Sequence, residues 1–278
     1  MKLLRVGLMG QEIPAIVDDD GQYRDLSSVV ADIAGEVLWP EGLQKIANID
    51  IQQLPVISSD QRIGACVGGI GKFVCIGLNF ADHAEESGMS IPDEPVVFNK
   101  WTSAVCGPND DVIKPRGSTK LDWEVELGIV IGKPGAYIAE SDTDQHIAGY
   151  CVVNDVSERN FQLERGGQWD KGKGCDTFGP TGPWLVTQDE VPNVLNLNMN
   201  LEVNGKSYQA GNTKTMIFSP AFIVSYLSRF MSLQSGDVIS TGTPPGVGLG
   251  QNPPVYLEVG DEMTVSITGL GEQRQRVV

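Results

Sequence analysis

The chain has 278 residues, of which 41% are hydrophobic and 20% charged, and its formal net charge is −16. This length suits one large domain or a core domain with a small companion. An acidic chain without a concentrated basic stripe repels the phosphate backbone, which argues against nucleic acid as a partner. It also repels organic acids, so a site for such a substrate has to supply positive charge locally.

The cysteines and the apolar segments indicate where the protein works. The five cysteines form no close Cys-X-X-Cys pair, so neither a disulfide framework nor a zinc knuckle is indicated. The start of the chain lacks the apolar stretch of a signal peptide, and no apolar run reaches the roughly 18 residues of a membrane span. We therefore expect a soluble, cytoplasmic protein that does not associate with membranes.

The first part of the chain resembles a small α/β unit. Residues 3–9 and 13–17 have the apolar, β-branched composition of short strands, with a turn of consecutive aspartates and a glycine after the second. Residues 25–38 are predicted to form a helix capped by Asp25 or Ser27. No catalytic motif stands out here.

Two domains are predicted from the pattern of turns. Residues 1–65 form the small N-terminal domain, and residues 66–278 form the main domain, with the glycine-rich segment 58–72 leading from one to the other. The 33 glycines and 16 prolines of the chain favour a body rich in strands over a helix bundle.

Strands recur along the main domain with turn signals between them, a pattern typical of a sheet sandwich or barrel. The expected fold class is therefore mostly β within the α+β class. The predicted strands are 73–78, 124–132, 148–156, 182–187, 197–205, 237–242 and 262–269.

Two helices are expected to interrupt these strands. One covers 80–88, with Asn79 as its cap. The other covers 219–233, where Ser219 caps the helix and Pro220 lies in its first turn. The apolar face of the second helix is predicted to pack into the core through Phe222, Ile223, Tyr226, Leu227 and Phe230.

Two glutamates lie two residues apart within a predicted strand. Because strand side chains alternate between faces, Glu124 and Glu126 point the same way, while Val125 and Leu127 point the other way. Such a pair is either the solvated face of a half-covered strand or a crowded anionic site. In the second case a positive partner is needed, and a metal ion is one candidate.

Asp155 follows another apolar run, where strands give way to functional loops. Its simplest role is a turn or a helix cap. Together with Glu124 and Glu126 it would form an all-oxygen ligand set, which suits Mg²⁺ or Mn²⁺ with water completing the octahedron. Zinc is disfavoured because the chain has only two histidines.

A candidate acid–base pair lies in the first predicted helix. His83 and Glu86 are three residues apart and therefore share a helical face. This spacing is common in surface ion pairs. Its functional interpretation is a general base, in which the carboxylate orients the imidazole that takes a proton from water. The other histidine, His146, has no such partner in the sequence and is interpreted as structural.

Two later loops carry groups that suit an anionic substrate. Lys171 and Lys173 lie in the glycine-rich loop QWDKGKGCDTFG, where lysines are usually solvated but can also supply positive charge to a site. Thr243 lies in STGTPPGVG, whose backbone N–H groups and hydroxyl can hold a carboxylate. This second loop lacks the lysine of a phosphate-binding loop, so nucleotide binding is not inferred.

Five motifs in sequence order carry a resemblance to a known family. GLNFADHAEES, DWEVELGIVIG, VVNDVSERN, KGKGCDTFGPTGPW and STGTPPGVG resemble the fumarylacetoacetate hydrolase family, over about residues 70–278. The resemblance implies a main domain of β-sheets rolled into a sandwich-like barrel. It also implies a homodimer and a divalent metal in the site.

The resemblance assigns roles position by position. It matches the metal ligands of the family to Glu124, Glu126 and Asp155. It matches the catalytic pair of the family to His83 and Glu86. If Glu124 and Glu126 are metal ligands, the resemblance explains why two glutamates lie on one face of a strand, since both would face the metal.

Three further assignments concern the substrate. Lys173 matches the site lysine of the family, Thr243 matches the threonine that binds the substrate carboxylate, and Gln209 falls where many members place a glutamine near the substrate. The sequence departs from many relatives at Phe80, where they have tyrosine, and at Gly174, where they have serine. The glycine is expected to make the lysine loop freer.

The resemblance implies a hydrolase that cleaves carbon–carbon bonds in 2,4-diketo acids. The long loop around Lys173 and the C-terminal GLGEQRQRVV are most similar to hydrolases of 2,4-diketo-3-deoxy-L-rhamnonate or L-fuconate, which would yield pyruvate and lactate. The alternatives are an isomerase or decarboxylase of 2-oxo acids, of the 2-hydroxyhepta-2,4-diene-1,7-dioate isomerase or oxaloacetate decarboxylase type. Similar sequences are also labelled ureidoglycolate lyases, and a noncatalytic metal-binding protein is a further alternative.

Overall fold

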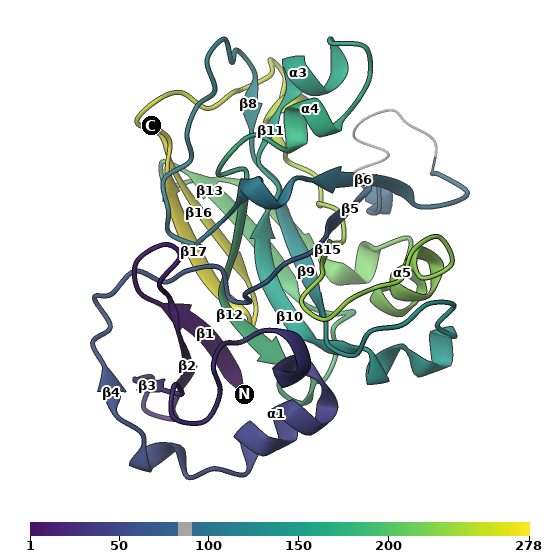
Figure 1. Cartoon of the computed structure of the whole chain (residues 1–278). Helices are drawn as coiled ribbons and strands as arrows, with labels where there is room; N and C mark the ends of the chain where they lie inside the picture. Colours follow the sequence, from purple (N-terminus) through teal and green to yellow (C-terminus); the bar gives the residue numbers. More distant parts are fainter. Residues whose placement is uncertain (83–90) are drawn as a thin grey trace.

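The structure is a computed structural model that describes residues 1–82 and 91–278. Its main feature is an 11-stranded mixed sheet, shown in Figure 1. In spatial order its strands are β4 (Val56–Ile57), β3 (Tyr23–Asp25), β2 (Ile13–Val17), β1 (Lys2–Val6), β12 (Gly179–Thr187), β10 (Ile147–Asn154), β9 (Val125–Ile131), β15 (Val238–Ser240), β5 (Phe73–Gly77) and β6 (Val96–Lys100), and β7 (Val105–Cys106) pairs with β12.

Two smaller sheets complete the β structure. A four-stranded antiparallel sheet has the order β14 (Lys206–Asn212), β13 (Asn198–Val203), β16 (Glu262–Ile267) and β17 (Gly271–Arg276). It packs against β9, β10 and β12 of the large sheet. The remaining pair joins β8 (Leu121–Asp122) to β11 (Ser157–Glu158).

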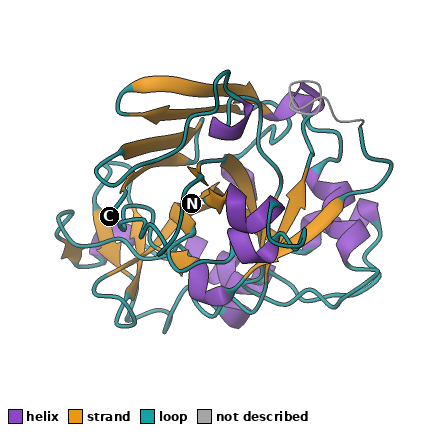
Figure 2. Ribbon diagram, turned by 90° about the horizontal axis from the view of Figure 1, so that it is seen from above, coloured by secondary structure: helices purple, strands orange, loops and turns teal. Residues whose placement is uncertain are grey.

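The helices are short and lie around the sheets, as the view from above in Figure 2 shows. The α-helices that lie wholly within the described residues are α1 (Pro40–Ala47), α3 (Arg159–Leu163), α4 (Asp170–Lys173) and α5 (Pro220–Leu227). The 3-10 helices are η1 (Gly35–Leu38), η2 (Ile51–Gln53), η3 (Thr102–Ala104), η4 (Glu140–Gln145), η5 (Gln188–Glu190), η6 (Thr213–Thr215) and η7 (Gly248–Gly250). The predicted fold class, mostly β within α+β, is confirmed.

The core lies on both faces of the large sheet. Trp123 and the alternate residues of β9 that follow it pack with the four-stranded sheet, in one cluster with Met199 and Val265. Val130 of the same strand packs on the opposite face, in a cluster with Cys151. The predicted alternation is therefore confirmed, and both faces of β9 are covered by protein.

The N-terminal unit shares the large sheet with the main body. β1 pairs antiparallel with β12, with Lys2 opposite Val186. Leu3 is fully buried in one cluster with Leu185 and Val238 of the main body. The predicted boundary at residue 65 therefore falls between two parts of one continuous sheet, and independent folding of residues 1–65 stays a prediction.

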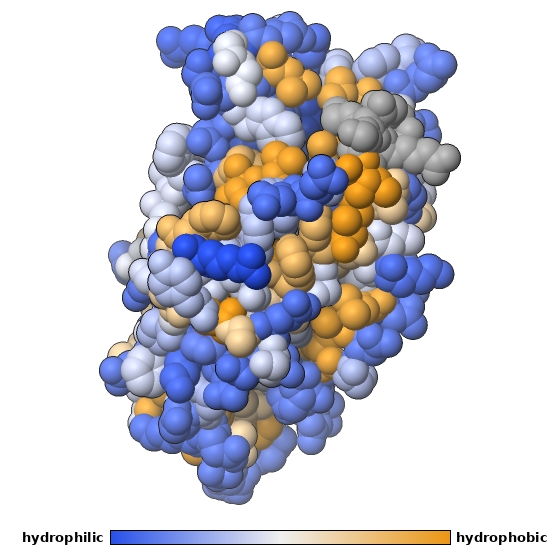
Figure 3. All heavy atoms as spheres, turned by 90° about the vertical axis from the view of Figure 1, so that its right-hand side faces the viewer, coloured by the Kyte–Doolittle hydropathy of each residue, from blue (hydrophilic) through white to orange (hydrophobic). Residues whose placement is uncertain are grey.

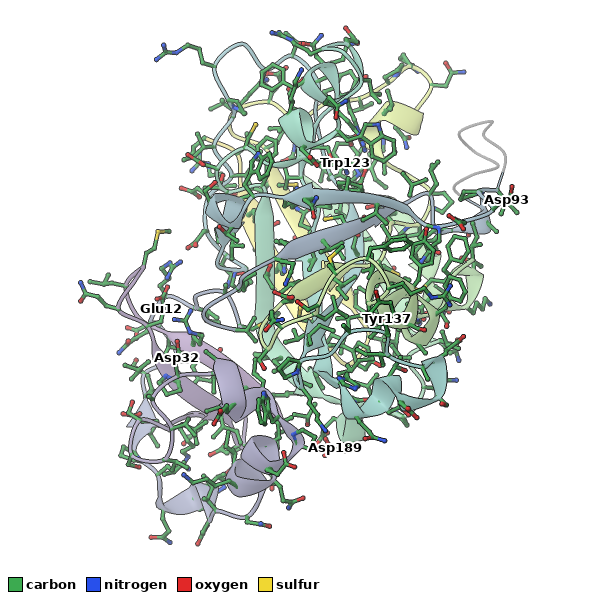
Figure 4. The ribbon with its side chains drawn as sticks, turned by 45° about the vertical axis from the view of Figure 1, so that its right-hand side comes forward. Glu12, Asp32, Asp93, Trp123, Tyr137 and Asp189 are labelled. Atoms are coloured by element: carbon green, nitrogen blue, oxygen red, sulfur yellow. The ribbon has the colours of Figure 1, made fainter. Side chains whose placement is uncertain are left out.

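Ion pairs also fasten this unit. Figure 4 labels Glu12 and Asp32, both in the N-terminal unit. Arg5 Nε lies 2.6 Å from Asp32 Oδ1. Arg62, in the segment that leads into the main body, pairs with Glu12 at 2.9 Å and with Asp110 at 2.6 Å. Since Asp110 belongs to the main body, Arg62 links the two parts of the chain.

The helix predicted for residues 25–38 is wrong. Asp25 ends β3, and its side chain accepts a hydrogen bond from the backbone N–H of Ser27 at 2.7 Å, which closes a local turn in place of a helix. Gly35, the first residue of the short η1, has a φ of 55°, outside the right-handed helical region, and no α-helix forms before residue 40. The first α-helix begins at Pro40, a residue suited to a first helical turn.

The predicted start of the helix at Ser219 is confirmed, whereas the helix ends at Leu227, before the predicted end at residue 233. Ser219 Oγ accepts a hydrogen bond from Phe222 N at 3.1 Å, and Pro220 is the first residue of α5. Phe230, predicted as core, lies beyond the helix end and is 65% exposed, so that assignment is wrong. Its ring continues a row of aromatic contacts along α5, on the side of the molecule where Figure 3 shows hydrophobic residues gathered.

Two further sequence predictions concern the helix over residues 80–88 and the absence of a membrane span. Of the helix predicted over 80–88, residues 83–88 lie outside the described residues. Within the described ranges, no helix is long and apolar enough to cross a membrane.

We expect Leu3→Ala to lower the free energy of unfolding by about 2–5 kcal/mol, because it opens a cavity in a core that both parts of the chain share. Leu8→Ala is the matched control, since Leu8 is 70% exposed, and is expected to change stability by less than about 0.5 kcal/mol. Chemical denaturation followed by circular dichroism measures both. Equal, small effects of the two changes would show that β1 contributes little to the main core.

Candidate active site

Three carboxylates converge where β9 and β10 pair. Val125 lies opposite Asn154, so the antiparallel register continues with Glu124 opposite Asp155, and Asp155 N donates to Glu124 O at 2.9 Å. Glu126 lies two residues along β9 on the same face. One carboxylate oxygen from each of the three lies within 4.8 Å of the others.

The carboxylates are shielded from solvent. Glu124 is 6% exposed, Glu126 1% and Asp155 0%. The interpretation of the glutamate pair as a solvated strand face is therefore wrong. Buried carboxylates need cations or hydrogen-bond donors, because desolvation of an unpaired charge is very costly.

Lys173 supplies one of these cations. It ends α4, and its Nζ donates to Glu124 Oε2 at 2.9 Å and to Asp155 Oδ2 at 2.8 Å. Burial on its own would lower the pKa of Lys173, but the carboxylates of Asp155 and Glu124 outweigh it and raise the pKa above its ordinary value. The ammonium therefore stays charged within the site.

Two further cations were missed by the sequence analysis. Arg159 Nη2 lies 2.7 Å from Glu124 Oε1, while its Nε lies 2.7 Å from Asp122 Oδ2. Lys100 Nζ lies 2.5 Å from Asp155 Oδ1 and donates to two backbone carbonyl oxygens. Two sequence features could have pointed to these residues. Lys100 lies at an inward-facing position of the strand VVFNK, and Arg159 follows Asp155 by four residues.

The site shifts the pKa values of its two glutamates in opposite directions. Burial would raise the pKa of Glu124, but Lys173 and Arg159 outweigh it and hold the pKa below its ordinary value. Burial raises the pKa of Glu126, and the neighbouring Asp155 and Glu124 raise it further. Repulsion among the three carboxylates is therefore only partly offset by the cations around them.

Glu126 is held in place by donors from β15 and the loop after it. Its Oε2 accepts hydrogen bonds from Ser240 Oγ at 2.5 Å and from Gly242 N at 2.8 Å. Its pairing with these donors fixes one oxygen of the carboxylate. Within residues 1–82 and 91–278 both hydrogen bonds to this carboxylate go to Oε2, which leaves Oε1 open to a ligand.

The residues fit a divalent metal. All three side chains offer oxygen donors, as Mg²⁺ and Mn²⁺ prefer. Asp155 Oδ1 is fully buried, and its partner among the described residues is the Lys100 ammonium, 2.5 Å away. Each carboxylate oxygen has more than one lone pair, so Asp155 keeps acceptor capacity for a metal beside its ion pairs.

A cavity of about 330 Å³ opens onto the carboxylates. Glu124, Glu126, Lys173, Arg159 and Thr243 line its polar end. Its apolar wall is formed by Ile76, Phe98, Leu163, Trp169 and Leu249. The cavity therefore has the size and the divided polarity of a small-molecule site.

Thr243 and Gln209 lie at different depths. Thr243 lines the cavity, and its Oγ1 donates to Val125 O at 2.9 Å. Gln209 is fully buried behind it, where Nε2 donates to Thr243 Oγ1 at 2.8 Å and Oε1 accepts from Val125 N at 2.9 Å. Gln209 is therefore connected to the cavity through Thr243.

His83 and Glu86, the predicted catalytic pair, lie outside the described residues. The chain just before them is anchored beside the site. Asn79 Nδ2 donates to Thr241 O at 2.7 Å, next to the Gly242 N–H that binds Glu126. Phe80, which replaces the tyrosine of many relatives, is fully buried.

The lysine loop is closely packed at two of its glycines. Residues 170–173 form α4, and a Cβ on Gly172 would lie 2.4 Å from Glu158 O. A Cβ on Gly174 would lie 2.4 Å from Cδ1 of Trp101. The Trp101 ring packs where a side chain at position 174 would lie, and the greater freedom expected of the loop from Gly174 stays a prediction.

A buried acidic cluster beside a small-molecule cavity in a mostly β body is typical of an enzyme active site. Comparisons with known proteins identify the family. The family model Fumarylacetoacetate (FAA) hydrolase C-terminal matches residues 72–278. The chain therefore belongs to the fumarylacetoacetate hydrolase family, as its motifs predicted. It is 60% identical over 276 residues to a protein of Burkholderia multivorans named only as a hydrolase, covering 99% of this chain and 98% of that one.

Solved structures are similar along the whole chain. A fumarylacetoacetate hydrolase from Exiguobacterium antarcticum matches with a TM-score of 0.89 at 33% identity, covering 100% of this chain and 99% of that one. A 2-hydroxyhepta-2,4-diene-1,7-dioate isomerase from Mycobacterium marinum matches at 0.78 and 31%, covering 100% and 98%. A maleylpyruvate hydrolase from Sphingobium sp. SYK-6, in complex with manganese(II) and pyruvate, matches at 0.82 and 27%, covering 100% and 99%.

We expect Gly172→Ala to destabilise the protein by about 1–3 kcal/mol and to displace Lys173, because the added methyl group meets backbone atoms that cannot rotate away. Gly174→Ala is the matched control. It meets the side chain of Trp101, which is 55% exposed and is able to turn aside, so its cost is expected to be smaller. Thermal and chemical unfolding compare the two, and a larger loss for Gly174→Ala would contradict this account.

Proposed function

We propose that the chain is a metal-dependent hydrolase that cleaves a carbon–carbon bond in 2,4-diketo acids. The observation that carries the proposal is the convergence of Glu124, Glu126 and Asp155 beside a buried Lys173 in the wall of a small-molecule cavity. The structural similarity to a maleylpyruvate hydrolase whose structure contains manganese(II) and pyruvate supports it. We assign Mg²⁺ or Mn²⁺ to the three carboxylates.

The bound metal would supply Lewis acidity to the C1 carboxylate and the 2-oxo oxygen of the substrate. Lys173 adds a positive charge beside the same site, where enolate charge develops. Thr243 binds the carboxylate end of the substrate through its backbone N–H, because its hydroxyl already donates to Val125 O and accepts from Gln209 Nε2. These cationic and polar groups offset the repulsion between an organic acid and a chain of net charge −16.

The hydrolytic step uses the pair known from the family motif. His83 deprotonates a water that attacks the C4 carbonyl, and Glu86 orients the imidazole and stabilises its protonated form. Collapse of the adduct breaks the bond between C3 and C4. A pyruvate enolate leaves, and Lys173 stabilises its negative charge until C3 is protonated.

We propose 2,4-diketo-3-deoxy-L-rhamnonate or L-fuconate as the substrate. Hydrolysis of these six-carbon acids gives pyruvate and lactate. Their tail ends in a methyl group, which suits the apolar wall that includes Leu163, Trp169 and Leu249. We further propose that the enzyme works in the cytoplasm as a homodimer.

A second candidate is an isomerase or decarboxylase of 2-oxo acids built on the same metal site. The similarity to the isomerase from M. marinum supports this alternative. Enolisation requires the metal and Lys173, whereas hydrolysis also requires an activated water. The dependence of the reaction on His83 therefore separates hydrolysis from simple isomerisation, and the products separate hydrolysis from decarboxylation.

An assay series with 2,4-diketo acids of differing tails tests the proposed reaction. Loss of the enol absorbance and coupled detection of pyruvate follow each substrate in parallel. We expect stoichiometric pyruvate and the highest kcat/KM for the methyl-terminated six-carbon acids. Loss of the enol absorbance without pyruvate would support isomerisation. Turnover of oxaloacetate with release of carbon dioxide, and no turnover of the 2,4-diketo acids, would support decarboxylation.

We expect Glu124→Gln to abolish metal-dependent turnover, because it removes one anionic ligand and leaves Arg159 and Lys173 with a neutral partner. Glu202→Gln makes the same chemical change at an exposed position of β13 and is expected to leave turnover unchanged. Initial rates at saturating Mn²⁺ and a Mn²⁺ titration compare the variants. Full activity of Glu124→Gln would remove this residue from the metal site.

We expect His83→Ala to retain Mn²⁺ binding and to lower kcat by about 10²-fold or more, the usual contribution of a general base. His146→Ala is the control, since His146 contacts Lys133 O in another part of the molecule. Steady-state kinetics on the best substrate measure both variants. If His83→Ala keeps the full rate on every diketo acid, the hydrolytic role assigned to His83 is wrong.

A further inference from the structure

The cations around the three carboxylates divide the carboxylate oxygens into two sets. Arg159 Nη2 contacts Glu124 Oε1 at 2.7 Å, and Lys100 Nζ contacts Asp155 Oδ1 at 2.5 Å. The other oxygens of the same two carboxylates, Glu124 Oε2 and Asp155 Oδ2, both accept hydrogen bonds from Lys173. Among the described residues, Lys173 is thus the cation that bridges two of the three predicted metal ligands.

Arg159 and Lys100 are fastened by groups outside the three carboxylates. Arg159 Nε contacts Asp122 at 2.7 Å, and Nη1 donates to Gln162 Oε1 at 3.1 Å. Lys100 Nζ donates to Val156 O at 2.9 Å and to Lys173 O at 2.5 Å. These contacts hold both cations even when a carboxylate changes partner.

Lys173 is fastened differently. Within residues 1–82 and 91–278, its Nζ hydrogen-bonds only to Glu124 and Asp155, and its other contact is the face of the Phe98 ring, 5.0 Å away. It lines the cavity, as the two glutamates do. Among Lys100, Arg159 and Lys173, it is therefore Lys173 whose hydrogen bonds all go to the carboxylates of the site.

We propose that Lys173 and the divalent cation compete for Glu124 Oε2 and Asp155 Oδ2. Lys173 neutralises these oxygens until a metal binds and then gives them up, while Arg159 and Lys100 keep the two carboxylates in position. The physical reason is that an octahedral Mg²⁺ takes its oxygen ligands at about 2.0–2.1 Å. An ammonium on the same oxygens would lie within a few ångströms of a doubly charged cation and be repelled by it.

This competition also bears on the substrate, in a step that rests on the proposed function. An ammonium that gives up the two carboxylates still belongs to the cavity wall, where the 2-oxo acid binds. Lys173 is then available to the substrate anion only after metal has bound. The metal would therefore have to bind before a productive substrate complex forms.

Three neutralising variants separate competition from a general charge effect. Lys173→Met, Lys100→Met and Arg159→Met each remove one positive charge that contacts the same carboxylates. If charge alone mattered, all three would bind Mn²⁺ more tightly. Competition predicts that only Lys173→Met gains affinity, by about tenfold or more, since its two charge-assisted hydrogen bonds no longer oppose binding. Lys100→Met and Arg159→Met are expected to bind no more tightly than the wild type.

Isothermal titration calorimetry of each purified chain with MnCl₂, without substrate, measures these affinities. Lys173→Gln is a second neutral variant of similar length, for use if Lys173→Met does not fold by circular dichroism, and is expected to behave in the same way. The proposal is overturned if the Lys173 variants bind Mn²⁺ as the wild type does or more weakly, if all three methionine variants tighten equally, or if the wild type does not bind Mn²⁺. Because no turnover is measured, failure of the proposed hydrolase reaction leaves this result unaffected.

Discussion

Repulsion among three buried carboxylates determines the arrangement of the site. The pairing of β9 with β10 fixes Glu124 opposite Asp155, and the two-residue period of a strand adds Glu126 to the same face. Such a cluster persists only when cations and hydrogen-bond donors reach it from the surrounding structure. The elements around it, from β6 to the loop after β15, are therefore positioned by the need to neutralise one buried anionic centre.

The neutralising groups come from distant parts of the chain. Lys100 ends β6, Arg159 begins α3 and Lys173 ends α4, while Gly242 follows β15. Close packing brings them in, because Gly172 lies against the backbone of Glu158 and leaves no room for a side chain. A chain of strong overall negative charge thereby builds a local site in which cations are concentrated, as binding of an organic anion requires.

Much of this site was predictable from the sequence because it follows from local rules. The two-residue spacing of Glu124 and Glu126 specifies a shared strand face, and the structure confirms it. Lys100 and Arg159 were not found, because their positions give only a weak local signal and their ion pairs with the carboxylates depend on tertiary packing. The helix predicted for residues 25–38 failed for a related reason, since turn formation by Asp25 and the left-handed Gly35 outweighed helical propensity. The constraint on Gly174 likewise depends on Trp101, which is distant in sequence.

The central claim is that Glu124, Glu126 and Asp155 bind one divalent cation. A crystal structure of the protein grown with Mn²⁺, with anomalous data collected at the manganese absorption edge, tests it most directly. The account predicts a single strong anomalous peak with oxygens of all three residues at about 2.0–2.3 Å. Absence of a peak between these carboxylates in crystals that contain Mn²⁺, or a peak bound by other residues, would contradict it.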